Sequence, residues 1–118
     1  MENTQYYPIE FDSLGRSFTV HNSGTAPAPC VVTFIPKFDF LKLVIAGLTD
    51  EPITFTGLKT GQVLVIDGEE RTVTVDGVSA FDKYDAWEFP KLQPGANQIT
   101  IENGSGATIS IEYNARYI

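Results

Sequence analysis

Apolar and polar residues alternate with a period close to two along the second half of the chain. In residues 99–102 and 109–113 every second position holds isoleucine or tyrosine, and the positions between hold threonine, serine or glutamate. The two segments flank the turn-forming sequence NGSG at 103–106. One apolar and one polar face is the pattern of an antiparallel sheet with one buried side. These segments therefore predict a terminal β-hairpin.

A second hairpin is predicted from residues 63–66 and 72–75, which lie on either side of Asp67-Gly68. Both residue types tolerate the positive φ of a type I′ turn, and the following residues 69–71 lengthen the loop or form a bulge. Four more short strands are predicted from RSFTVHN (16–22), CVVTFIP (30–36), FLKLVIAG (40–47) and PITFTG (52–57), each bounded by Gly, Pro, Asn or Asp. The roughly eight strands predict an all-β fold, an antiparallel β-sandwich or jelly roll.

Helical patterning is weak throughout. No window shows the apolar spacing of a long helix, and SAFDKYDAWEF at 79–89 has room for one helical turn. The first 14 residues alternate poorly and are predicted to be an N-terminal arm or linker. A chain of 118 residues fits one domain, so residues 15–118 are predicted to form a single β-sandwich.

Charge and composition narrow the classes of partner. The formal net charge of −7 disfavours binding to nucleic acid or to anionic lipid, because both need Lys and Arg side chains to replace counterions. The single cysteine, Cys30, has no partner for an internal disulfide. No apolar run reaches the roughly 20 residues that span a bilayer, and residues 1–12 lack a signal-peptide pattern. We therefore expect a protein made in the cytoplasm and not inserted into a membrane.

Catalytic and metal-binding residues are sparse. His21 is the only histidine, and no motif places it beside a nucleophile, so we expect no enzyme activity and no cofactor. A zinc site normally needs three or four ligands, and the chain has one His and one Cys. Four acidic residues gather in the sequence VDGVSAFDKYDAWE, without the spacing of an EF-hand, and are expected to form a solvated acidic loop with no metal: Asp76, Asp82, Asp85 and Glu88.

Tyr84 and Trp87 lie among these acidic residues. Exposed aromatic faces beside carboxylates are a common way for sandwich domains to hold sugars, which makes these two residues candidate sugar contacts. The alternative is that Trp87 and Phe89 fill the core, and we favour this alternative because the sole Trp of a small domain is more often a core residue.

The segment FPKLQPGANQITIEN at 89–103 carries the most specific pattern. Pro94-Gly95 predicts a type II turn, with Pro at the second and Gly at the third position. Together with Asn22-x-Gly24-Thr25-x-x-x-Pro29 and the terminal YNARYI, this segment resembles the C-terminal domain of phage distal tail proteins, the siphovirus-type tail components, over about residues 15–118. The residues that carry the resemblance most strongly are Phe89, Pro90, Leu92, Pro94, Gly95, Asn97 and Ile99.

The resemblance implies a galectin-like β-sandwich with a structural, non-catalytic role in a phage or prophage tail tip or baseplate. It implies a virion protein made in the bacterial cytoplasm, whose partners are other tail, baseplate or receptor-binding proteins. In that family an N-terminal domain forms a ring around the tail channel. Oligomerisation is therefore expected only with such a domain upstream. The alternative function is a non-catalytic carbohydrate-binding module that helps the particle attach to saccharides of the host surface.

Overall fold

The computed structural model describes residues 4–11, 16–37, 39–86, 88–102 and 107–114, which form twelve strands in two antiparallel sheets. The larger sheet has the order β1-β12-β3-β6-β7-β8, and β10 pairs with the first residues of β3. Its strands are β1 (Thr4–Phe11), β3 (Ala28–Pro36), β6 (Leu64–Asp67), β7 (Thr72–Val75), β8 (Val78–Ser79), β10 (Lys91–Leu92) and β12 (Ala107–Asn114).

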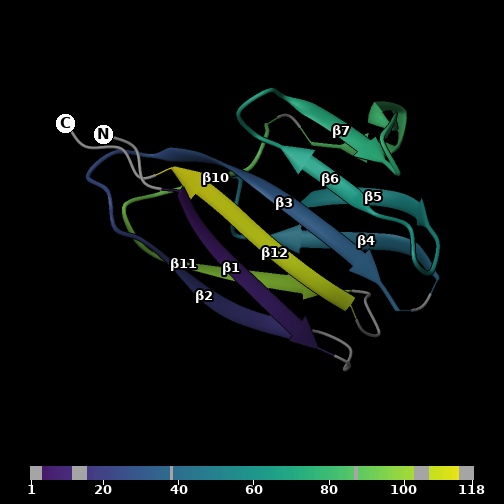
Figure 1. The fold of residues 1–118 in the computed structure, drawn as a ribbon, viewed down its shortest axis with the longest axis horizontal. Helices are drawn as coiled ribbons and strands as arrows, with labels where there is room; N and C mark the ends of the chain where they lie inside the picture. Colours follow the sequence, from purple (N-terminus) through teal and green to yellow (C-terminus); the bar gives the residue numbers. More distant parts are fainter. Residues whose placement is uncertain (1–3, 12–15, 38, 87, 103–106, 115–118) are drawn as a thin grey trace.

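The smaller sheet has the order β2-β11-β4-β5-β9. Its strands are β2 (Arg16–Asn22), β4 (Phe40–Ala46), β5 (Ile53–Leu58), β9 (Tyr84–Asp85) and β11 (Gly95–Glu102). A single 3₁₀ turn, η1 (Phe81–Lys83), precedes β9 and confirms the helical turn predicted in this segment. Figure 1 shows the two sheets as layers, with β1, β12, β3 and β6 in front of β2, β11, β4 and β5.

The core lies between the two sheets and follows the alternation of the sequence. In β3 every second residue is buried, from Ala28 to Pro36. In β11 and β12 the buried positions include the predicted isoleucines and Tyr113, which confirms the terminal hairpin and the orientation of its faces. The largest fully buried side chains come from both layers: Phe34, Phe55, Leu43, Ile45, Leu48, Ile53, Leu58, Leu64, Ile66, Leu92, Ile99 and Ile101.

The predicted all-β antiparallel sandwich is confirmed, but it has more strands than the eight expected. Three of the additional strands, β8, β9 and β10, are two residues long and show no alternation that a sequence pattern could reveal. The fourth is β1, which pairs with β12 along its full length, from Thr4 with Asn114 to Phe11 with Ala107. Residues 4–11 are therefore an edge strand and not the arm or linker expected there.

The proline in β1 explains why the sequence did not predict this strand. Pro8 interrupts its sequence, and proline removes a backbone donor, which argues against a strand in the middle of a sheet. An edge strand tolerates proline because one of its sides has no neighbour, and β1 is the last strand of its sheet.

The β6–β7 loop differs from the predicted turn. Asp67 pairs with Thr72, so the loop has four residues, and the Asp67 carboxylate accepts hydrogen bonds from the backbone N–H groups of Glu69 and Glu70 at 2.9 Å each. The positive φ lies at Arg71, at 60°, and not at Gly68. A two-residue turn with positive φ at both positions occurs instead at Asp76-Gly77, between β7 and β8.

Candidate functional site

The segment from β9 to β11 passes back and forth between the two sheets. β9 pairs with β5 in the smaller sheet, β10 pairs with β3 in the larger one, and β11 returns to the smaller one between β2 and β4. The Pro90 carbonyl accepts a hydrogen bond from the Cys30 N–H at 3.1 Å, and the Lys91 N–H donates to the Leu48 carbonyl at 3.1 Å. Residues 89–97, which carry most of the family resemblance and are called the marker segment below, therefore connect both layers at one end of the sandwich.

Asn97 holds the turn that precedes β11. Its side-chain oxygen accepts a hydrogen bond from the Gln93 N–H at 2.9 Å, and its amide nitrogen donates to the carbonyls of Gln93 at 2.8 Å and Gly95 at 3.1 Å. The same nitrogen lies 3.3 Å from the Val20 carbonyl on β2. Gly95 has a φ of +90°, the sign that the predicted type II turn requires there. In the sequence P-G-x-N, the asparagine side chain therefore stabilises the turn by hydrogen bonds to the backbone of residues 93 and 95.

A second asparagine connects this segment to the loop after β2. The buried Asn22 amide donates to the carbonyls of Leu92 at 3.0 Å and Ala26 at 3.2 Å, and its oxygen accepts from the Gly24 N–H at 2.9 Å. The Tyr113 hydroxyl donates to the His21 carbonyl at 2.9 Å from the far end of β12. Asn22 and Asn97 therefore connect the segment from β10 to β11 with β2 and with the loop that follows it.

The aromatic residues of this region pack on one another. The ring of Tyr84 stacks on Phe89 with centroids 5.3 Å apart, and Phe81 contacts both rings at about 6 Å. The Tyr84 hydroxyl donates to the Glu88 carbonyl at 2.6 Å, and burial raises the pKa of this phenol above its usual range. Only 7% of Tyr84 is exposed, so it offers no open face to a sugar ring. The other candidate sugar contact, Trp87, lies outside the described residues.

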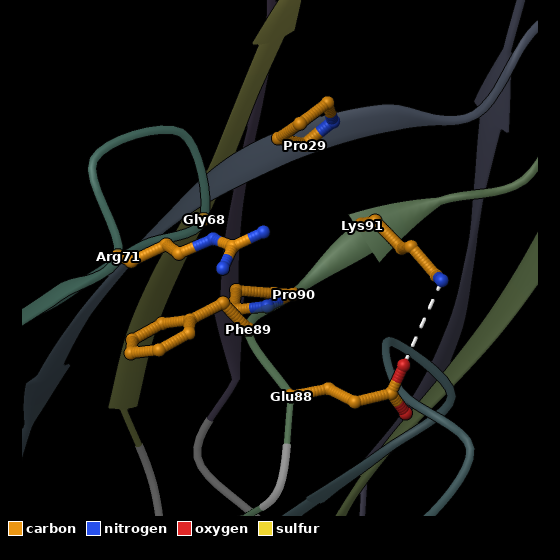
Figure 2. Close-up of a pocket in the computed structure, with 7 residues that line it drawn as sticks. All are labelled: Pro29, Gly68, Arg71, Glu88, Phe89, Pro90 and Lys91. Carbon is orange, nitrogen blue, oxygen red and sulfur yellow. Dashed lines mark ion pairs between the residues drawn. The ribbon is translucent and has the colours of Figure 1, made fainter.

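A pocket of about 300 Å³, which the sequence pattern did not predict, opens beside the marker segment. Gly68 and Pro90 lie close together in it: a Cβ at Gly68 would come within 2.2 Å of the Pro90 carbonyl oxygen, so only glycine fits there. Figure 2 shows its lining, which combines two prolines and an aromatic ring with three charged side chains: Pro29, Gly68, Arg71, Glu88, Phe89, Pro90 and Lys91.

The charges in this pocket are unevenly compensated. The Lys91 ammonium lies 3.6 Å from the Glu88 carboxylate, whose other oxygen accepts a hydrogen bond from the Asp50 N–H at 3.0 Å. Glu88 points away from Arg71 in Figure 2. Within the described part of the chain the Arg71 guanidinium has neither a hydrogen bond nor an ion pair. The pocket therefore carries one uncompensated positive charge.

Neither an accessible thiol nor a cluster of metal ligands is found among the described residues. Cys30 is fully buried, and its burial, with the nearby Asp67 carboxylate, raises the pKa of the thiol to about 12, so the thiolate nucleophile is scarce at neutral pH. Within the same ranges, no three His, Cys, Asp or Glu side chains gather as metal ligands. The described chain also has no helix that is long and apolar enough to cross a membrane.

Comparison with known families decides the classification. The family model described as "Siphovirus-type tail component, C-terminal domain" matches residues 23–117. The chain belongs to this family. The match includes the whole marker segment of this tail-component domain, from Phe89 to Asn97, and confirms the resemblance inferred from the sequence. A search among curated proteins gave no significant match.

Solved structures show the same fold. The crystal structure of SPP1 Dit (gp 19.1), described as a paradigm of the hub adsorption apparatus in phages that infect Gram-positive bacteria, matches with a TM-score of 0.62 at 13% identity. The match covers 94% of this tail-component domain and 48% of SPP1 Dit, so the chain spans about half the length of that protein. A ruminal GH26 endo-β-1,4-mannanase matches 91% of the chain and 18% of its own at 12% identity, with a TM-score of 0.42, too low to bear on function.

Proposed function

We propose that this domain is a structural, non-catalytic module of a phage or prophage tail tip, which works through contacts with other tail proteins. The observation that carries the proposal is the family match over residues 23–117. Two marker residues in that range, Leu92 and Asn97, form structural hydrogen bonds at one end of the sandwich, and Asn22, just before the matched range, binds the Leu92 carbonyl.

A non-catalytic role is supported by the chemistry of the described residues. The most nucleophilic side-chain type in the chain, the Cys30 thiol, is buried and protonated at neutral pH. The carbohydrate-binding alternative is not favoured, because Tyr84 is buried against Phe89 instead of facing solvent. A protein–protein role fits a sandwich fold, because edge strands and loops are common sites of partner binding.

Mass spectrometry of purified phage or prophage particles tests the proposal. We expect tryptic peptides of this chain to persist through density-gradient purification, in a constant ratio to the other tail proteins. Separately, the purified chain incubated with host cell walls should release no sugar or peptide fragments. Absence of the chain from intact tailed particles would refute the structural role, and release of cell-wall fragments would refute the non-catalytic one.

A further inference from the structure

We infer that the pocket beside the marker segment binds a carboxylate of an acidic peptide segment on a neighbouring tail protein, with Arg71 as the residue that recognises it. This inference rests on the proposed function, because it names the chemistry of a partner for the same domain. It is drawn from the pocket's charge, shape and backbone geometry.

The charged residues that line the pocket favour an anionic ligand. The chain carries a net charge of −7, yet the pocket has Arg71 and Lys91 in its lining against Glu88 alone. The acidic residues Glu69 and Glu70 of the β6–β7 loop do not line this pocket; they line a neighbouring one with Glu112, and Pro29 borders both. Glu88 is held by Lys91 and by the Asp50 N–H, so Arg71 is the cation left for an incoming anion.

Arg71 has an unusual backbone conformation. Arg71 has a φ of 60°, a conformation that costs a residue with a side chain about 1–2 kcal/mol and that glycine adopts freely. Glycine would adopt this φ without the cost, so the presence of a side chain at this position is a reason to test Arg71 for a role. Figure 2 shows that the Arg71 side chain extends toward Pro90 and Phe89, which line the pocket with it.

Size and lining favour a peptide over a polyanion. A volume of about 300 Å³ accommodates a side chain or two. One planar guanidinium pairs with one carboxylate through two parallel hydrogen bonds, whereas a phosphate chain needs several cations. The half-buried Phe89 ring and the prolines Pro29 and Pro90 provide an apolar wall next to the charge. Beyond the wall, Phe81 is 53% exposed and in contact with Phe89, which extends the apolar surface toward a partner. The occupant is therefore an acidic residue next to a large apolar one.

Titration of the ¹⁵N-labelled full chain with acetyl-Phe-Glu-amide tests this site directly. We expect saturable shifts at the backbone amides of Gly68, Arg71 and Lys91, with a Kd of about 1 mM at low salt and weaker binding at higher ionic strength. Acetyl-Phe-Gln-amide, which lacks only the charge, should bind about tenfold more weakly. Equal binding of the two peptides, or no saturable shift with either, overturns the inference.

Variants at position 71 separate recognition from folding. Arg71→Gln should weaken binding of acetyl-Phe-Glu-amide about tenfold, whereas Lys42→Gln, which removes an exposed charge from β4, should leave it unchanged. Arg71→Gly should also lose binding, while its thermal midpoint stays equal to or above that of the wild type, because glycine relieves the positive φ. Retention of binding in either Arg71 variant refutes the assignment. Unfolding of Arg71→Gly refutes the argument that the backbone is strained for the sake of the side chain.

Two further outcomes are informative. Tighter binding of glycerol 3-phosphate than of acetyl-Phe-Glu-amide would overturn the peptide assignment in favour of a phosphate-containing polymer. The peptide titration does not depend on the particle: if it fails while the chain is present in purified tails, only the inference about the pocket is lost. If the titration succeeds and the chain is absent from tails, the proposed function is lost and the carboxylate site remains.

Discussion

Replacement of Asn97 by alanine tests whether the marker segment is a structural closure. Asn97 is 7% exposed and forms the hydrogen bonds that fix residues 93–95 before β11. Its two shortest bonds, 2.9 Å from the Gln93 N–H and 2.8 Å to the Gln93 carbonyl, each contribute about 1 kcal/mol net. The amide nitrogen has two hydrogens, and one of them is left for the longer bonds to the Gly95 and Val20 carbonyls. These two bonds together add less free energy than one further hydrogen bond.

The sum predicts that Asn97→Ala lowers the free energy of unfolding by about 2–3 kcal/mol. Urea unfolding followed by circular dichroism measures it: with an m-value of about 1.5 kcal/mol/M the midpoint should fall by about 1.5 M. The amide hydrogen of Gln93 should also exchange faster, because its acceptor is the Asn97 side chain.

Gln98→Ala is the matched control, one residue further along β11. Gln98 is exposed and its side chain makes a single surface hydrogen bond to the Ser17 hydroxyl at 3.1 Å. Its loss should change stability by less than about 0.5 kcal/mol. If Asn97→Ala is as stable as the wild type, or if both variants lose the same amount, the asparagine does not fix the turn and the structural explanation of the motif fails.

Three further predictions concern the same end of the sandwich. Gly68→Ala should cost about 3 kcal/mol in urea unfolding, because its Cβ would collide with the Pro90 carbonyl, whereas Gly77→Ala, with φ of +82° and open space around it, should cost about 1–2 kcal/mol. Burial raises the pKa of the Cys30 thiol, so the thiol stays protonated in the folded state but ionises near pH 9 in the unfolded state. Between pH 9 and 10 the wild type should therefore lose about 1 kcal/mol more stability than Cys30→Ala. Equal losses in the two proteins would contradict the burial of the thiol. Tyr84→Phe should cost about 1 kcal/mol in thermal unfolding, from the loss of its hydrogen bond to a backbone carbonyl; no loss would mean that the phenol is solvated.

The strands with a buried face were predictable from the sequence because burial imposes a period of two. Ile99, Ile101, Ile109 and Ile111 are fully buried, as their alternation predicted. The turn at Pro94-Gly95 was predictable for a similar reason, since few residues adopt the φ of +90° found at Gly95. Local backbone preferences and one-sided burial are both visible in a short stretch of chain.

The pocket was not predictable, because it is made by residues far apart in the sequence. Pro29, the loop at 68–71 and residues 88–91 meet only through the pairing of β3 with β6 and β10. The burial of Tyr84 was ambiguous for a different reason: tyrosine suits both an exposed sugar platform and a buried position with its hydroxyl bonded. The low exposure of Tyr84, the hydrogen bond of its hydroxyl to the Glu88 carbonyl and the stacked Phe89 ring together identify the buried position.

Immunogold labelling of intact particles tests the central claim most directly. Antibodies raised against the 118-residue chain, and shown to bind it in solution, would be applied to purified tailed particles viewed by electron microscopy. A tail-tip module predicts gold at the end of the tail distant from the capsid. Gold on the capsid or along the tail tube, or particles left unlabelled by an antibody that binds the purified chain, would contradict it.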